Sequence, residues 1–252
     1  MATWASEGII LKRNNWGETD KTLTIFTRQR GKVRVLAKGV RRVHSRRAPN
    51  IELFNHSKLF FHESKETNIL SEADTVTSFN NLKSDLNKIS YAYRIAEVID
   101  HFFPEATDSA GLFELILDCL ETMDASGDSI SIRLTSTAAE LKLLAHAGFR
   151  PQLFVCSKCS RALIEQTHLL SPEHGGLIDR GCNGEMTLSK PVSVEAIKLL
   201  RFLMDSPWEE VVKLRVSESV SKEVDQALSF YLEYILEEKL RSTNFINKVE
   251  SL

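Results

Sequence analysis

Three cysteines and an aspartate in the second half of the chain have the spacing of a metal site. Cys156 and Cys159 form a Cys-x-x-Cys knuckle, and Cys182 follows after 22 intervening residues. Asp179 stands three residues before Cys182, where the second knuckle of a zinc ribbon would carry a cysteine. Zinc takes four ligands in a tetrahedron, and a carboxylate is an accepted ligand. The predicted ligands of one structural zinc ion are therefore Cys156, Cys159, Asp179 and Cys182.

Other interpretations of these cysteines stay open. His174 lies between the knuckle and Cys182 and is an alternative source of the fourth ligand. The segment is also compatible with a metal-free, β-rich ribbon that has kept some of its thiols. A catalytic zinc is disfavoured, because no His-x-Glu or His-Glu-x-x-His pattern accompanies the cysteines.

A cluster of positively charged residues lies near the start of the chain, in residues 21–51. This segment carries ten Lys and Arg residues and no Asp or Glu, whereas the remaining 22 basic residues are set against all 34 acidic ones. A nearly neutral chain that gathers positive charge in one short segment builds a local field, and nucleic acid is the commonest polyanion attracted by it. Arginine outnumbers lysine seven to three here, and its planar fork suits phosphate oxygens.

The basic segment combines a strand with a loop. Basic residues alternate with apolar ones up to Ala37, which is the period of a strand with one buried and one exposed face. The arginine-rich stretch beyond has no such pattern and is predicted to be a mobile loop. A strand face beside such a loop can follow a phosphate backbone. The predicted nucleic-acid-binding residues are Lys32, Arg34, Lys38, Arg41, Arg42, Arg46 and Arg47.

Two plainer alternatives accompany this interpretation. The charges of residues 21–51 would also serve to keep a sheet edge soluble and unpaired. Trp16, just before the segment, is either a stacking surface for a base or a part of the core.

The elements that must position the basic residues are strands. Residues 5–77 are rich in β-branched and aromatic residues, with turns near Gly17 and Gly31 and no helical period, which predicts five short strands. Five strands in so short a segment favour a small barrel of the OB-fold type. Such barrels often bind oligonucleotides across a strand face and its loops. We therefore predict an OB-fold nucleic-acid-binding domain over 1–79.

After this segment the hydrophobic period becomes that of helices. Apolar residues recur at three- and four-residue spacing on both sides of the cysteine segment. We predict a helical domain, a zinc-ribbon-like insertion and C-terminal helices that complete the helical domain, over 80–150, 151–190 and 191–252. The helices of 80–150 are expected to pack as a bundle, and the polar tail from Arg241 is expected to fray. The predicted fold class is α+β and multidomain.

Composition indicates the class of protein and the compartment. An apolar fraction of 42% and a charged fraction of 26% are typical of a globular protein. No apolar run is long enough to cross a bilayer, and the N-terminus lacks the basic leader and apolar stretch of a signal peptide. We therefore predict a cytoplasmic location, at the nucleoid for a DNA-binding protein. In that reducing compartment cysteines are more often metal ligands than disulfide partners.

Short motifs spread over most of the chain, in order, resemble those of one family. They are GIIL (8–11), WGETD (16–20), LTIFT (23–27), GK (31–32), AKGVRR (37–42), ELKLL (140–144), GFRP (148–151), CSKC (156–159) and GGL (175–177). This ordered set resembles the family of the bacterial DNA repair protein RecO. Asp179 departs from the family pattern, in which many members have a cysteine, and this puts the zinc ion in doubt.

The resemblance implies a recombination mediator without enzymatic activity. The family has an N-terminal OB barrel, a helical domain and a small zinc-finger-like insertion. Its members bind single- and double-stranded DNA and anneal complementary strands. They engage the acidic C-terminal tail of the single-stranded-DNA-binding protein and, together with RecR, help RecA to load onto coated strands. These partners, and no membrane, are what the resemblance leads us to expect.

Three other functions are alternatives on the sequence alone. A nuclease would need clustered carboxylates or a His-bearing metal site, and the seven histidines are scattered without a recognisable catalytic partner. An RNA-binding or translation-associated OB-fold module would show the same charge pattern, because RNA is also a polyanion. A pure interaction adaptor would use the acidic helical half as its working surface.

Overall fold

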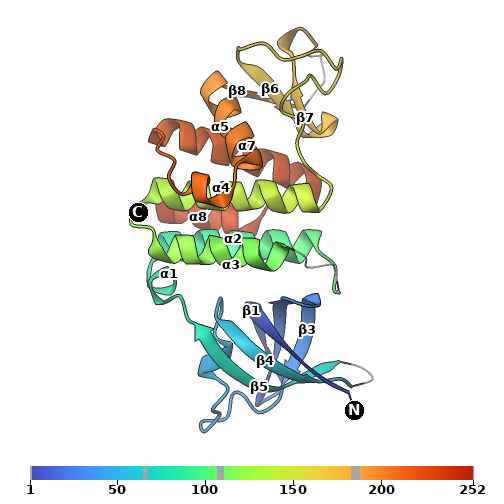
Figure 1. Ribbon diagram of the computed structural model, residues 1–252, viewed down its shortest axis with the longest axis vertical. Helices are drawn as coiled ribbons and strands as arrows, with labels where there is room; N and C mark the ends of the chain where they lie inside the picture. Colours follow the sequence, from blue (N-terminus) through green and yellow to red (C-terminus); the bar gives the residue numbers. More distant parts are fainter. Residues whose placement is uncertain (1, 65–66, 107–110, 183–187, 252) are drawn as a thin grey trace. The chain divides into compact units, whose positions relative to one another are not determined.

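The computed structural model divides the chain into two compact units (Figure 1). The barrel unit comprises Met1–Asp85 and Phe103–Asp124, and the helical unit comprises Leu86–Phe102 and Ala125–Leu252. The residues that the structure describes are 2–64, 67–106, 111–182 and 188–251. The predicted division into four parts along the chain stays a prediction, because these units are defined by contacts and not by chain order.

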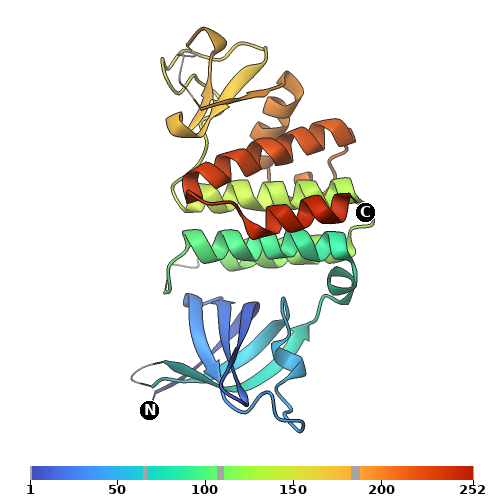
Figure 2. The same cartoon turned by 180° about the vertical axis from the view of Figure 1, so that it is seen from behind.

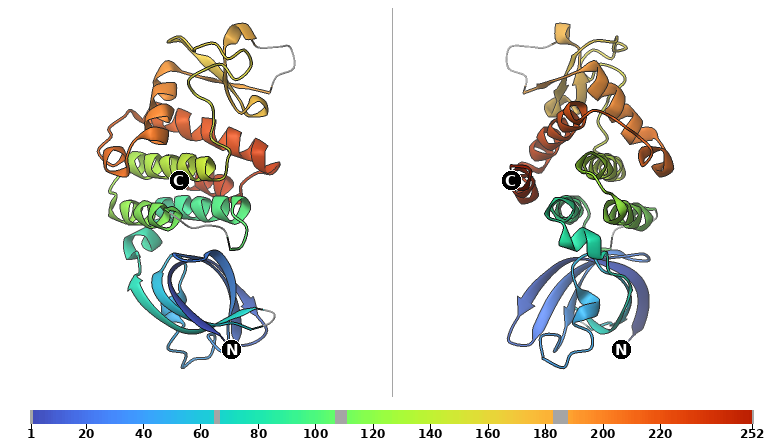
Figure 3. Two further views of the ribbon diagram at one scale, coloured as in Figure 1. Left: turned by 45° about the vertical axis from the view of Figure 1, so that its right-hand side comes forward. Right: turned by 90° about the vertical axis from the view of Figure 1, so that its left-hand side faces the viewer.

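Five strands close into a barrel, visible end-on in the left view of Figure 3. Their bounds are Thr3–Trp16 (β1), Asp20–Thr27 (β2), Gly31–Ala37 (β3), His56–His62 (β4) and Asn68–Thr77 (β5). β1 pairs with β2 and β4, and a parallel pairing of β3 with β5 completes the order β1-β2-β3-β5-β4. The predicted five-stranded OB-type barrel and the α+β class are confirmed. The interior is filled by Ile10, Leu23, Ile25, Val33, Val35, Ala37, Val40, Ile51, Leu59, Phe61, Leu70 and Ala73.

Three further elements belong to the barrel unit. They are the 3-10 turn Pro49–Ile51 (η1) and the helices Asn80–Ser84 (α1) and Leu112–Ala125 (α3). The ring of Phe113 on α3 stands edge-on to His56 of β4, with 5.7 Å between ring centroids. The contacts therefore group α3 with the barrel and not with the neighbouring helices along the chain, unlike the three-helix bundle expected for 80–150.

Six helices of the described residues build the helical unit. They are Leu86–Phe102 (α2), Ser129–His146 (α4), Val194–Asp205 (α5), Trp208–Val211 (α6), Glu218–Leu236 (α7) and Arg241–Glu250 (α8). α4 is buried along most of its length and contacts α2, α5 and α7, so it is the central helix. Side chains of Asp128, Ser193 and Ser217 accept hydrogen bonds from the first turns of α4, α5 and α7, which explains where these helices begin. None of the described helices combines the length and apolar composition needed to span a membrane.

The tail that was expected to fray is the helix α8, which lies along α2 (Figure 2). The carboxylate of Glu97 accepts hydrogen bonds from the N–H groups of Arg241 and Ser242, each at 3.0 Å. At the other end, Glu250 Oε1 accepts from Arg133 Nη2 at 2.6 Å. Both partners are far away in sequence, so the polar composition of the tail alone led to a wrong expectation.

A buried ion network of Arg94, Glu140 and Asp225 joins α2, α4 and α7. Arg94 Nη2 donates to Glu140 Oε2 at 2.8 Å, and Nη1 donates to Asp225 Oδ1 at 3.0 Å. Burial raises the pKa of the Glu140 carboxyl, and the charge of Arg94 opposes part of this rise. Burial would lower the pKa of Arg94, but Asp225 and Glu140 more than reverse this effect. Arg94 and Glu140 therefore favour each other's charged form.

The insertion between α4 and α5 contains a small antiparallel sheet in the order β7-β6-β8. Its strands are His168–Ser171 (β6), Gly176–Ile178 (β7) and Lys190–Val192 (β8), with 3-10 turns at Pro172–His174 (η2) and Arg180–Cys182 (η3). A Cβ atom on Gly176 would lie 2.2 Å from the carbonyl oxygen of Gln152. Only glycine allows the chain entering the insertion to pass so close to β7.

Candidate nucleic-acid interface and cysteine cluster

The basic loop, residues 38–48, is fastened to the turn between β1 and β2. The N–H of Gly39 donates to Asp20 Oδ1 at 2.7 Å, and the N–H of Arg41 donates to a carbonyl of the turn at 2.9 Å. Val40 is buried and joins the barrel core. The loop predicted to be mobile is thus anchored at several points, which gives its exposed side chains a defined place.

Arg47 anchors the far end of the same loop. Its Nη1 donates to the carbonyl oxygens of Leu70 and Ser71 on β5, at 2.7 and 3.3 Å. Its Nη2 donates to the carbonyl oxygen of Lys38 at 2.6 Å. The guanidinium group is therefore engaged by the backbone of its own unit, and the expected contact of Arg47 with nucleic acid stays a prediction.

Four cations of the loop extend from this frame into solvent. We call Lys38, Arg41, Arg42 and Arg46 the loop cations; all four are exposed. Within the part of the chain that the structure describes, none of them lies within ion-pair distance of a carboxylate. They form the part of the predicted binding set that is accessible and has no carboxylate within ion-pair distance there.

Two of the loop cations help to lower the pKa of the nearby Asp20 carboxyl. The pKa of this carboxyl is lowered first by the N–H of Gly39, then by the hydroxyl of Thr19, and further by the charges of Lys38 and Arg42. Asp20 therefore stays ionised and holds the loop in place, although the sequence analysis did not single it out.

The two predicted residues on β3 have different surroundings. Arg34 is exposed, and its Nε lies 3.2 Å from Glu105 Oε1 in the same unit. Lys32 is only 3% exposed, so the expectation that it projects into solvent is wrong. The carbonyl oxygen of Lys32 accepts a hydrogen bond from the N–H of Ala106 at 3.0 Å, which places Ala106 beside this end of β3. Strand alternation cannot reveal such a long-range contact.

Other cations of residues 21–51 are neutralised inside the barrel unit. Arg28 forms ion pairs with Glu7, at 3.0 Å, and with Glu114. Arg30 lies 2.6 Å from Glu63 and stacks over the ring of Trp4. The open positive surface is therefore narrower than the sequence suggests and is centred on the loop cations.

Trp16 lies at the end of β1, beside the turn to which the basic loop is fastened. Its exposed fraction is 61%, which excludes the alternative that it is a core residue. Arg41 Nη1 donates to the carbonyl oxygen of the adjacent Gly17 at 3.0 Å. The turn that carries the exposed indole is therefore also bound by a loop cation, which suits a base stacking near a phosphate contact.

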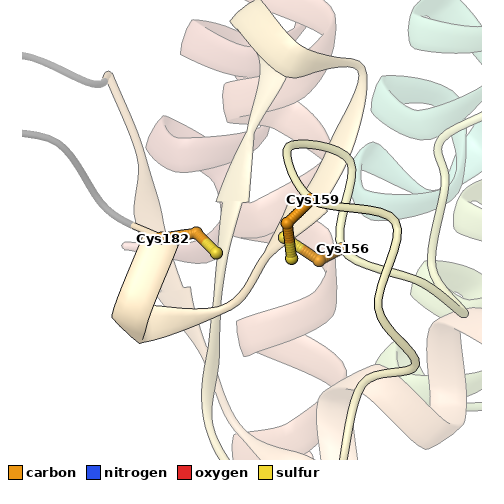
Figure 4. A group of neighbouring side chains, drawn as sticks. All are labelled: Cys156, Cys159 and Cys182. Carbon is orange, nitrogen blue, oxygen red and sulfur yellow. The ribbon is translucent and has the colours of Figure 1, made fainter.

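The second candidate site is the cysteine cluster of Cys156, Cys159 and Cys182, whose side chains point toward one another (Figure 4). Their sulfur atoms all lie within 4.8 Å of one another. The knuckle is closed by a hydrogen bond from the N–H of Ser160 to the carbonyl oxygen of Cys156 at 2.8 Å. The turn η3 delivers Cys182 from the other side. Three thiols that converge in this way can hold a metal ion.

The carboxylate of Asp179 does not join the thiols. Its oxygens accept hydrogen bonds from Gln166 Nε2 at 3.2 Å and from the N–H of Gly181 at 2.8 Å. Its own N–H instead donates to Cys156 Sγ at 3.3 Å. His174 is also turned elsewhere, with its Nδ1 3.0 Å from Ser171 Oγ. The structure therefore does not support Asp179 as the fourth ligand, since its side chain braces the turn that carries Cys182.

The surroundings of the thiols favour a metal ion. Burial opposes ionisation of Cys156, but N–H groups of Asp179, Cys159 and Lys158 outweigh it and lower the pKa of this thiol to about 7. The side chains of Cys159 and Cys156 raise the pKa of Cys182 to about 11, because neighbouring sulfurs cannot all carry negative charge without a cation. A thiophilic cation such as zinc would relieve this conflict.

Comparisons with known proteins agree with this architecture. Residues 1–79 match the family described as Recombination protein O N terminal, and residues 83–244 match Recombination protein O C terminal. A DNA repair protein RecO from Roseiflexus sp. (strain RS-1) is 36% identical over 99% of this chain and 87% of the relative. Another, from Symbiobacterium thermophilum, is 30% identical over 100% of this chain and 99% of the relative. This chain therefore belongs to the RecO family of DNA repair and recombination proteins.

Proposed function

We propose that this protein binds single- and double-stranded DNA, anneals complementary strands, and acts with RecR to help RecA load onto strands coated by single-stranded-DNA-binding protein. Membership of the RecO family supports a role in DNA repair and recombination. The observation that carries the finer proposal is the set of loop cations. They are exposed, fastened to the barrel, and without a carboxylate partner in the described part of the chain.

The loop cations act on the phosphate backbone. Their binding releases condensed counterions, so affinity falls steeply as salt rises. Phosphate contacts carry little sequence information, which suits a protein that must accept any strand. Two strands held on one positive surface repel each other less, and pairing then proceeds without bond cleavage. We therefore propose a mediator that acts by binding and not as an enzyme.

The proposed protein partners are RecR, the C-terminal tail of the single-stranded-DNA-binding protein and, indirectly, RecA. The family relationship supports them. Because the tail is acidic, we propose that it docks on a cationic surface and avoids an acidic one. These encounters would take place in the cytoplasm at the nucleoid.

Annealing of two complementary labelled oligonucleotides tests the function. We expect the protein to speed pairing of naked strands, and of strands coated by single-stranded-DNA-binding protein, with a rate that falls as salt is added. Fluorescence energy transfer between labels on the two strands measures the rate. Equal rates with and without the protein would contradict the proposal.

The variant Trp16→Ala separates stacking from phosphate contact in the same assay. Stacking of a base on an indole contributes about 1–3 kcal/mol, so affinity for a single strand should fall about tenfold. Affinity for a duplex should change little, because paired bases are not free to stack on Trp16. An equal loss for both ligands would mean that the indole only supports the turn.

We further propose that the cysteine cluster holds a structural zinc ion in the insertion. Protein purified with zinc in the medium should contain the metal in equal molar amount, and Cys182→Ser should lose it, because two thiolates bind zinc far more weakly than three. Asp179→Asn should keep the metal, since the Asp179 carboxylate is bound by Gln166 and Gly181. Plasma mass spectrometry measures the content, with Cys119→Ala as the control for loss of a thiol elsewhere. Metal-free native protein would refute the proposal.

A further inference from the structure

α4 and α7 end on the same side of the helical unit (Figures 1 and 2). A groove of about 840 Å³ lies at these ends. It is lined by the chain that leaves α4, by η2 and by the last turns of α7. It shares no residue with the loop cations or the cysteine cluster. A function for it therefore goes beyond the strand handling proposed above.

The floor of the groove is apolar and accessible. Phe149, Tyr234 and Leu188 are 44%, 41% and 49% exposed. The inner side of Phe149 packs against Phe102 with 5.3 Å between centroids, and its carbonyl oxygen accepts a hydrogen bond from Tyr231 at 3.3 Å. Phe149 is thus held in place while part of its ring stays exposed, which is how aromatic anchors of peptide-binding grooves are presented.

The rim of the groove is acidic. Four carboxylates line it, from Glu173, Glu233, Glu237 and Glu238. Of these, Glu238 faces His101 at 3.2 Å, and the other three have no ion pair in the described part of the chain. The lining also contains Lys239 and Arg150, and Arg150 is already paired with Asp205 at 2.5 Å.

The backbone adds to this negative potential. α4 ends at His146 and α7 at Leu236, and both helix ends border the groove. The carboxyl end of a helix carries roughly half a negative charge from its aligned peptide dipoles, so it favours cations. Side chains and helix ends therefore select against DNA and against an acidic peptide.

We propose that the groove binds a cationic amphipathic peptide segment of a partner protein. Its aromatic or aliphatic residues would occupy the floor formed by Phe149, Tyr234 and Leu188. Its Lys or Arg residues would lie against the carboxylates of the rim and the two helix ends. Charge complementarity requires a positively charged partner, whose charge is opposite to that of a nucleic acid or an acidic tail.

Fluorescence anisotropy with the full-length protein tests the proposal. The probe is a short labelled peptide in which Lys and Arg alternate with Leu and Phe, compared with a peptide of the same apolar residues with Glu in place of the cations. We expect the cationic peptide to bind, and we expect the groove variants to weaken this binding. Any binding of the acidic peptide, which resembles the acidic tail considered above, should be unchanged in the groove variants. The pair Glu233→Gln with Glu237→Asn should weaken binding roughly fivefold, from two lost charge pairs. Asn is chosen because residue 237 has a φ of 55°, which Asn tolerates.

Two further variants separate charge from general damage. Tyr234→Ala should weaken binding about tenfold, as loss of a central aromatic anchor does. The control pair Glu195→Gln with Glu209→Gln removes the same charge from α5 and α6 and should leave binding unchanged. All groove variants should keep their melting temperature and their affinity for oligonucleotides, so failure of this inference is distinct from failure of the DNA-binding proposal.

Three outcomes would overturn the inference. One is equal weakening of the cationic and the acidic peptide by the groove variants, and a second is equal loss in the groove and control pairs. The third is self-association of the protein, seen by sedimentation, that the groove variants abolish. That result would assign the groove to a second copy of this chain, whose own basic loop carries the exposed Val43 between arginines.

Discussion

Reversing Arg41, Arg42 and Arg46 to Glu is expected to lower the affinity for single-stranded DNA about a hundredfold or more at low salt. Each reversal removes a phosphate contact and places a repelling charge at the same point. The slope of log affinity against log salt should become shallower by about 2, because three fewer phosphate contacts release fewer counterions. Anisotropy titrations of a labelled oligonucleotide at several salt concentrations measure both quantities.

Arg47 is left out of this variant on structural grounds. Its guanidinium group holds the carbonyl oxygens of Leu70 and Lys38, so its reversal would disturb the loop as well as the charge. The control is the triple variant Arg215→Glu, Arg241→Glu and Lys248→Glu, which makes the same change in net charge on exposed residues of the helical unit. An equal loss in both triple variants would show that net charge, and not the loop cations, attracts DNA.

Replacing Arg94 by Leu is expected to destabilise the helical unit by about 3–5 kcal/mol, the cost of leaving a buried charge without its partner. The variant leaves the carboxylate of Glu140, which is fully buried, without its cationic partner. It also removes the ion pair of Asp225. Urea unfolding followed by far-ultraviolet circular dichroism measures the effect, since most of the helix lies in this unit. A loss below about 1 kcal/mol would contradict it.

The double variant Arg94→Met with Glu140→Leu is the matched comparison. Replacing both ions by apolar side chains of similar volume is often close to neutral. We therefore expect it to be more stable than Arg94→Leu alone. The opposite order would show that shape, and not the stranded carboxylate, determines the loss.

The pH dependence of Arg94→Leu has a defined sign. Burial already raises the pKa of Glu140, and loss of Arg94 raises it further. The folded state then holds a proton that the unfolded state releases. The stability from this proton is complete below the unfolded pKa and is lost as pH rises through the folded pKa. The deficit relative to the native protein should therefore be smaller in mild acid than at neutral pH.

Local sequence patterns were enough to predict the barrel. They were not enough to predict which of its basic side chains are exposed to solvent. β-Branched and aromatic residues, and the turns near Gly17 and Gly31, are local signals, so the five-stranded barrel follows from the sequence. The backbone of Lys32 is bound by Ala106, and the anchoring of Arg47 depends on β5. Such long-range contacts leave no periodic signal. The turn around Asp20 was visible, but its role in holding Gly39 was not.

The cysteines and the tail show the same limit. Spacing identified three thiols that converge, because a knuckle is a local structure. Whether Asp179 is the fourth metal ligand depends on where its carboxylate points. That direction is set by hydrogen bonds from Gln166 and Gly181, which the spacing does not reveal. Helix α8 was missed because its stability comes from Glu97 and Arg133 on other helices.

The grouping of α3 with the barrel has a consequence for synthesis on the ribosome. The chain leaves the barrel unit after Asp85, returns at Phe103 and leaves again after Asp124. The barrel strands can pair as soon as they emerge, but Phe113 and Glu114 reach them only after α2 has been made. Until α4 and α8 follow, α2 lacks the helices that pack against it, so this nascent helix is where we expect a chaperone to be needed.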